Sequence, residues 1–256
     1  MRRRVLALAL VLASACGQAA SAPPPAATVL PSPTDSETTR PQVAVAPPLA
    51  SESPTPSPTP IPTIKLKLDA GWTAADRSAD GFAMALPPRW HSIDLDPYAL
   101  DASLRAIDDP QYQTLLRQQT ASLLTTGVKL FAFDLSATNV STSGFTTNLN
   151  VIEETLPYTV SLDVYAQVTV AQLEQLDAVS KPIGQQRVTL PAGPSQKLSY
   201  RVTLTSGTTK TTSAITQYLL VNGNIAYVLT FTTTPAQLGT YAPTFAKMAA
   251  TLTLAK

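Results

Sequence analysis

One stretch decides the fold of this chain: Asp80-Gly81-Phe82-Ala83-Met84-Ala85-Leu86-Pro87-Pro88-Arg89-Trp90. The Asp-Gly turn predicts the start of a strand in which three bulky apolar residues alternate with alanines. Because successive strand side chains point to opposite faces, Phe82, Met84 and Leu86 are expected on one face, over a core. The two prolines have no N–H to donate, so strand pairing should end there. Trp90 follows where it can close the edge of that core.

Capping residues followed by proline predict three helix starts downstream, because this pair suits the first helical positions: Asp96-Pro97, Asp109-Pro110 and Thr234-Pro235. The second helix should run to about Thr126 and stop at Gly127. A further helix should begin at Ser161, with its buried side made of Leu162, Tyr165, Val168, Leu173 and Leu176. The last should end near Ala250 and present four residues to a sheet: Leu238, Tyr241, Phe245 and Met248.

Further segments have strand composition: one near Trp72, then 90–95, 128–134, 145–152, 185–190, 196–204, 211–221 and 225–233. In 128–134 the alternation places Val128, Leu130 and Ala132 opposite Lys129, Phe131 and Phe133. Asn222-Gly223 predicts a two-residue hairpin loop between the last two strands. The expected fold class is therefore α+β, an antiparallel β-sheet flanked by helices over residues 64–256 and preceded by a disordered tether.

The N-terminus has the pattern of an export signal. Three arginines after Met1 form a positive region, and nine apolar residues from Val5 to Ala13 follow, far fewer than a membrane-spanning helix needs. Residues 1–15 are thus interpreted as a signal peptide, and the protein is expected on the extracytoplasmic side of the cell membrane.

Cys16 is the single cysteine and directly follows Ala13-Ser14-Ala15. This small-residue box resembles the one that precedes the lipid-modified cysteine of bacterial lipoproteins, although alanine stands where leucine is favoured. Cys16 is therefore the predicted lipidation site and the membrane the predicted partner. The same three residues also satisfy ordinary A-x-A cleavage, which would release the protein with a free thiol.

Residues 16–63 have the composition of a linker. Thirteen of the 23 prolines lie here, interleaved with Ser, Thr and Ala. Such a segment favours polyproline II and cannot form a packed core, so a semi-stiff tether is expected. Its Ser/Thr-Pro density also permits O-glycosylation, although a plain spacer is the favoured interpretation.

Composition excludes several classes of function. Lys and Arg number 18 against 17 Asp and Glu, a balance that argues against nucleic-acid binding. One cysteine rules out an intramolecular disulfide and cysteine metal clusters, and one histidine rules out histidine-rich metal sites. The glycines are scattered singly, without a phosphate-binding loop, so no cofactor is expected.

The D-G-F-x-M-x-L-P-x-x-W stretch at 80–90, followed by helices, a long antiparallel meander and an aromatic-bearing last helix, resembles the PsbP-like superfamily. More closely, the chain is similar to the LpqN-like bacterial lipoproteins, which share the anchor and polar linker. The resemblance covers about 70–253 in element order, but only 80–90 resembles a motif. It implies a sheet covered by helices and a non-enzymatic accessory or binding role. PsbP-type members assist a photosynthetic complex and Mog-type members bind a small GTPase, yet no residues used for those partners have a counterpart here.

Candidate catalytic groups are few. His91 is the only possible imidazole base, with Asp94 or Asp96 as nominal partners, but no G-x-S-x-G motif accompanies it. The acidic residues Asp94, Asp96, Asp101, Asp108 and Asp109 do not match the spacing of a calcium loop, so no metal site is expected. Glu153, Glu154 and Asp134 could form a carboxylate pair of the glycosidase type, although neighbouring strand residues point to opposite faces.

The leading hypothesis is a membrane-anchored lipoprotein with a non-catalytic accessory or ligand-binding domain, whose partner is an unidentified envelope protein or apolar ligand. A carrier of a lipid or other apolar molecule is the first alternative, and an envelope hydrolase using His91 is the second. The carrier hypothesis rests on aromatic residues that could line a cleft between helices and sheet: Phe131, Phe133, Tyr165, Tyr218, Tyr227, Phe231, Tyr241 and Phe245.

Overall fold

The computed structural model describes residues 64–93, 95, 100–102, 105, 113, 117, 123, 126–136, 146–206 and 208–255. The predicted signal peptide, Cys16 and the predicted linker lie outside this part of the chain, as do the predicted helix starts at Asp96 and Asp109. Residues 113, 117 and 123 are helical, in agreement with the helix predicted after Pro110.

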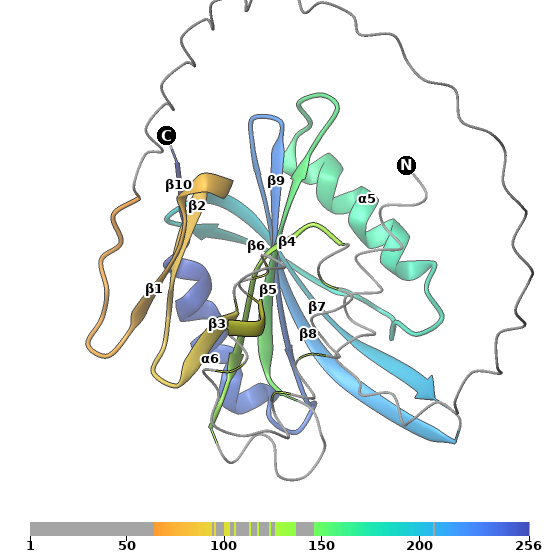
Figure 1. Ribbon diagram of the computed structural model, residues 1–256. Helices are drawn as coiled ribbons and strands as arrows, with labels where there is room; N and C mark the ends of the chain where they lie inside the picture. The colour runs from red at the N-terminus through yellow and green to blue at the C-terminus, as the bar shows by residue number, and fades with distance from the viewer. Residues whose placement is uncertain are drawn as a thin grey trace, which may run out of the picture. The chain divides into compact units, whose positions relative to one another are not determined.

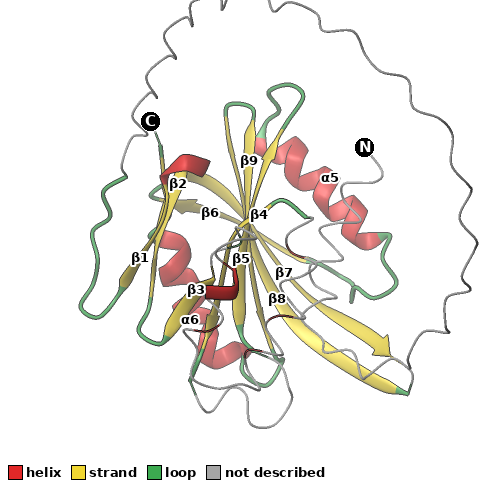
Figure 2. Cartoon of the chain, in the orientation of Figure 1, coloured by secondary structure: helices red, strands yellow, loops and turns green. Residues whose placement is uncertain are grey.

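Two antiparallel sheets form the framework (Figures 1 and 2). The seven-stranded sheet has the order β3-β4-β5-β9-β8-β7-β6, and the three-stranded sheet has the order β1-β2-β10. The larger sheet comprises β3 (Trp90–Ile93), β4 (Val128–Asp134), β5 (Asn148–Thr155), β6 (Gly184–Leu190), β7 (Gly193–Ser206), β8 (Thr209–Asn222) and β9 (Ile225–Thr233). The smaller comprises β1 (Thr73–Arg77), β2 (Phe82–Leu86) and β10 (Thr253–Leu254), with a short 3-10 helix η1 (Ser78–Asp80) between β1 and β2. The predicted α+β class is confirmed.

Helix α5 (Leu162–Glu174) and helix α6 (Leu238–Ala250) accompany opposite faces of the larger sheet. The α5-side core consists of one set of buried residues that includes Phe131, Phe133, Ile152, Leu173, Leu198, Tyr200, Ile215 and Val228. The α6-side core, shared with the small sheet, includes Phe82, Met84, Leu86, Trp90, Leu149, Leu229, Phe231, Phe245 and Met248. Both faces of the central strands of the seven-stranded sheet are thus buried, whereas most residues of the edge strand β6 are exposed.

The opening stretch behaves as its pattern predicts. Phe82, Met84 and Leu86 all lie in the α6-side core, and β2 is the central strand between β1 and β10. The alanines between them are also buried, which explains their small size. Trp90 is buried and meets Phe245 edge to face, with ring centroids 6.5 Å apart. The tryptophan therefore joins the first buried stretch to the last helix.

Two local predictions about the strands are wrong. A β-bulge between Val128 and Leu130 places Val128 on the same face as Phe131 and Phe133, because the extra residue shifts the alternation. The hairpin loop is Gly223-Asn224 instead of Asn222-Gly223, since Asn222 pairs with Ile225 and the positive φ falls on Gly223.

Helix α6 begins at Leu238. The Thr234-Pro235 pair forms a preceding turn, in which the Thr234 hydroxyl accepts from the Gln237 amide at 3.3 Å. The four residues expected to face the sheet do so, with Phe245 and Met248 fully buried.

Helix α5 starts as expected, because the Ser161 hydroxyl accepts the backbone N–H of Val164. Its buried side differs in part from the prediction. Leu162 and Leu173 are buried, but Val168 is 49% exposed and the inward stripe instead runs through Ala166, Thr169 and Val170. Because β-branched and small residues occur all around the helix, several of its faces are similarly apolar. Packing against the sheet therefore determines which face is buried.

Candidate functional site

Polar side chains interrupt the sheet face that α5 covers. Five of them are 3% exposed or less and belong to three adjacent central strands; we call them the buried polar rows: Asn148, Asn150, Gln217, Thr230 and Thr232. The opposite face of the same strands is lined by apolar and aromatic residues. The two faces of one sheet therefore differ in chemistry although both are buried.

Strand register brings these residues together. Asn150 and Gln217 pair with Thr230 from either side, and Thr232 pairs with Asn148 and Ile215. Apolar or aromatic residues end both rows: Phe131 and Phe133 on β4 at one side, and Leu198 and Tyr200 on β7 at the other. The result is a polar strip across the sheet with large apolar or aromatic side chains at both ends.

Several polar atoms in this strip have no hydrogen-bond partner. The Gln217 amide nitrogen donates to the Thr230 hydroxyl at 3.0 Å, but Gln217 Oε1, Asn150 Oδ1 and the Tyr200 hydroxyl are buried without one. Burying such an atom without a hydrogen bond lowers the stability of the fold by about 1–3 kcal/mol. Buried polar atoms are normally satisfied, so this face is the best candidate for a binding site.

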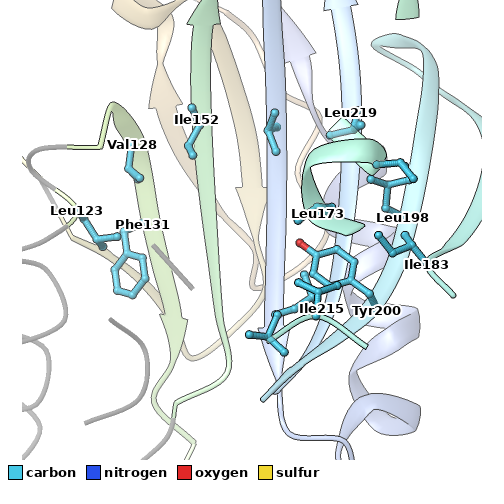
Figure 3. Close-up of a cluster of buried hydrophobic side chains, with 14 of the residues drawn as sticks. Leu123, Val128, Phe131, Ile152, Leu173, Ile183, Leu198, Tyr200, Ile215 and Leu219 are labelled. Carbon is cyan, nitrogen blue, oxygen red and sulfur yellow. The ribbon is translucent and has the colours of Figure 1, made fainter. Parts of the chain in front are cut away.

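Tyr200 belongs to the hydrophobic cluster of the α5-side core. Figure 3 shows its ring lying near Leu173 and Ile215, with the hydroxyl oxygen inside the apolar cluster. Complete burial raises the pKa of this phenol, because the surroundings disfavour the charged form. Tyr200 therefore offers a neutral O–H, able to donate and to accept, within the α5-side core.

A second polar group lies on the other face, at the end of β4. Asp134 is buried, and it accepts hydrogen bonds from the Ser136 amide, the Ser136 hydroxyl and the Tyr241 hydroxyl, at 2.9, 2.9 and 2.5 Å. Three donors satisfy this carboxylate. We interpret it as a structural link between β4 and α6.

A third polar cluster joins the two sheets. Asp80 forms ion pairs with Arg77 at 2.6 Å and with Lys129 at 3.0 Å. Partial burial raises the pKa of the nearby Glu153, with Lys129 acting in the opposite direction. The charges compensate one another, so we interpret this cluster as a structural link between the two sheets.

The structure separates the carboxylates considered as a pair. Glu154 accepts the Tyr165 hydroxyl at 3.1 Å on the α5 side, whereas Glu153 lies by Lys129 and Asp80. Asp134 lies beside Thr147, about 20 Å further along β5 at ordinary strand spacing. These three groups cannot form one glycosidase-type site.

His91 lies on the edge strand β3, and its side chain is exposed. Its nominal partners Asp94 and Asp96 fall outside the described residues, as do Asp108 and Asp109. Asp101 is exposed and forms an ion pair with Arg117. Within the described ranges no group of three His, Cys, Asp or Glu side chains is placed to hold a metal ion.

The eight aromatic residues expected in one cleft are divided between two cores. Phe131, Phe133 and Tyr165 belong to the α5 side, and the other five belong to the α6 side. The prediction of a single aromatic cleft is therefore wrong, because the sheet runs between the two groups.

Sequence reasoning did not identify Asn150, Gln217 and Tyr200. Asn148 and Asn150 occupy alternate positions of β5, a pattern that ordinarily indicates a solvent-exposed face, whereas Gln217 and Tyr200 each lie between apolar residues on the same face of their strands. The helix predicted from Ser161 was the one feature of the sequence that indicated an element able to cover this face.

Solved structures with similar folds have low sequence identity. The cyanobacterial PsbP protein (CyanoP) of Synechocystis is 15% identical, with 73% of this chain and 94% of that chain covered and a TM-score of 0.44. LpqN, described as involved in cell envelope biogenesis of Mycobacterium tuberculosis, is 9% identical, with 73% and 87% covered and a TM-score of 0.39. PA94, a Pseudomonas aeruginosa protein of unknown function, is 15% identical, with 44% and 75% covered and a TM-score of 0.38.

The first two structures represent the PsbP-like and LpqN-like groups that the sequence resembles. At these TM-scores the likeness concerns the fold and carries no conclusion about function. No protein-family model and no curated protein matches the chain. None of the helices in the described part of the chain combines the length and apolar character needed to cross a bilayer.

Proposed function

We propose that this chain is an exported, lipid-anchored binding protein whose folded domain holds a small molecule against the α5-side face of the seven-stranded sheet. One observation carries the binding role: Asn150, Gln217 and Tyr200 bury polar atoms without partners on one face of adjacent strands. A bound molecule that supplied hydrogen bonds there would remove a cost of several kcal/mol, a large part of the stability of a typical domain.

Support for export and anchoring comes from the first 63 residues. A positive start, a short apolar run and a single cysteine after small residues are typical of a lipoprotein signal. The proline-rich segment that follows suits a tether between the membrane and the domain. In this proposal Cys16 carries the lipid, and the domain works on the extracytoplasmic side.

The proposed role is non-catalytic. His91 is exposed, and within the described residues it has no hydrogen bond or ion pair that would orient it as a base. Hydrolysis by the purified chain that disappears in His91→Ala would contradict this part of the proposal. A structural or accessory role predicts no difference between the two proteins.

Native mass spectrometry of the full chain, purified from its own envelope under mild conditions, tests the proposal directly. We expect a non-covalent adduct that is lost under denaturing conditions and a covalent lipid mass that remains. The covalent mass should be missing from Cys16→Ser, which serves as the matched control. A protein without a non-covalent adduct would contradict the binding role and favour a protein partner, to be identified by crosslinking the anchored chain.

A further inference from the structure

The unpartnered atoms of the α5-side face form a line across four strands. Asn150 on β5 and Gln217 on β8 both pair with Thr230 on β9, so their backbones are about two strand spacings, or 10 Å, apart. Tyr200 on β7 pairs with Ile215 and is therefore a diagonal neighbour of Gln217. A molecule that met all three atoms would lie across the strands.

The unpartnered atoms indicate which hydrogen-bonding groups a ligand must carry. Gln217 Oε1 and Asn150 Oδ1 are acceptors, and they need hydrogen-bond donors from a partner. The Tyr200 hydroxyl, kept neutral by its burial, can take either part. Hydroxyl or amide N–H groups supply such donors, whereas an ester or ether oxygen does not.

The lack of charge in the described surroundings of the strip indicates that the ligand must be uncharged. Among the described residues, the buried members of the α5-side core include no charged side chain, and Glu154 near the end of β5 already accepts from Tyr165. An ionised ligand group placed here would lose its hydration without gaining a counter-ion. Around the strip lie Phe131, Ile215 and Leu198, which suit an apolar body.

We infer that this face binds an uncharged molecule with an apolar body and at least two hydroxyl or amide donors, and that Asn150, Gln217 and Tyr200 determine this preference. The inference rests on the proposed binding role and adds the chemical class of the ligand. It also separates two kinds of apolar ligand, since a free fatty acid is excluded while a neutral hydroxylated amphiphile of the same chain length is accepted.

Three probes with one acyl chain test the inference: monolauroylglycerol, laurate and methyl laurate. Binding is measured at pH 8 by titration calorimetry on the full chain carrying Cys16→Ser, so that neither lipid nor detergent competes. Monolauroylglycerol should bind at least about tenfold more tightly than the other two, because only it is both neutral and a donor. Equal or tighter binding of laurate would overturn the inference and leave the binding role intact. No binding of any probe would contradict both the inference and the binding role on this face.

Single substitutions test whether Tyr200 and Gln217 cause the preference for monolauroylglycerol. Tyr200→Phe removes only the buried hydroxyl and should weaken monolauroylglycerol about 5- to 10-fold while leaving methyl laurate unchanged. Gln217→Leu should do the same. Tyr218→Phe is the matched control, since Tyr218 is buried on the opposite face of the same sheet. If Tyr200→Phe and Gln217→Leu both bind monolauroylglycerol as wild type does, these residues do not determine the preference and the inference is wrong.

Discussion

Tyr241 donates its hydroxyl to Asp134 at 2.5 Å, and the two residues are 107 positions apart in the chain. The bond ties the first half of α6 to the end of β4. Asp134 holds two more hydrogen bonds from Ser136, so it is fixed from both sides. This contact closes the α6-side core at the edge where Trp90 meets Phe245.

Removal of that hydroxyl should weaken the fold. Tyr241→Phe leaves the ring stacked on Phe245 and removes the hydroxyl that donates to the Asp134 carboxylate, so we expect a loss of about 1–2 kcal/mol in the free energy of unfolding. Urea denaturation followed by tryptophan fluorescence measures it. Tyr158→Phe, at a 63% exposed tyrosine, should change nothing. An unchanged midpoint for Tyr241→Phe would show that the bond contributes no net stability.

Stability should also fall at alkaline pH. Burial, with the Asp134 hydrogen bond and charge, raises the pKa of Tyr241 from 10.0 to about 12. The folded state thus holds this proton more tightly than the unfolded state, so the contribution is complete below about pH 10 and is lost as pH rises towards 12. The difference in unfolding free energy between wild type and Tyr241→Phe should shrink over that interval. A difference that stays constant across it would exclude the linkage.

Two glycines with the same backbone geometry separate strain from crowding. Gly81 and Gly127 have φ of +75° and +76°, but an added Cβ would lie 2.8 Å from the Tyr227 hydroxyl at Gly81 and meet nothing within 4 Å at Gly127. Gly127→Ala should lower the free energy of unfolding by about 1 kcal/mol, because alanine is strained at this positive φ. Gly81→Ala should cost about 1–3 kcal/mol more, because Tyr227 packs edge to face on Phe82 and cannot move freely.

The Tyr227→Phe background provides the check on that crowding. Without the hydroxyl, Gly81→Ala should approach the cost of Gly127→Ala in thermal unfolding. If the two glycine positions differ as much as before, the contact with Tyr227 is not the cause.

The turn before Trp90 contains a strained residue. Arg89 has φ of 69° in a turn closed by the Trp90 amide on the Pro87 carbonyl, a position that favours glycine. Arg89→Gly relieves the strain of the left-handed conformation, and this gain in free energy exceeds the entropic cost of ordering a glycine on folding. We therefore expect the substitution to stabilise the folded protein by about 0.5 kcal/mol. Arg89→Ala, which keeps the strain, should not. A melting temperature of Arg89→Gly at or below that of Arg89→Ala would contradict this explanation.

Local rules predicted those elements whose signals lie within a few residues. The alternation at Phe82, Met84 and Leu86 gave a strand with one apolar face, and the Ser161 hydroxyl caps the helix that follows it. The same rules failed where a single residue shifts the pattern. The bulge at Val128 is set by pairing with β5, which lies outside any local window, and the loop at Gly223 is set by the register in which β8 and β9 pair, which the Asn-Gly dipeptide alone does not fix.

The candidate site shows the limit most clearly. Asn150 and Gln217 are 67 positions apart in the sequence. Locally, Asn150 indicates the polar side of a half-exposed strand, and Gln217 is a single polar residue between Ile215 and Leu219. They become a site only because both strands pair with Thr230 and because the polar face is the one that is buried on the α5 side. The same long-range packing divides the aromatic residues between two cores.

The sequence by itself determined the expectations for export, anchoring and tether, together with the strands, the capped helix and the absence of strong charge, since these depend on composition and on neighbours along the chain. Tertiary structure alone decided which sheet faces are covered and which distant residues meet there. The physical reason is that alternation assigns a residue to one of two faces, whereas burial of that face depends on the elements that pack upon it. For Asn150, Gln217 and Tyr200 this burial turns ordinary polar residues into the best candidate for function.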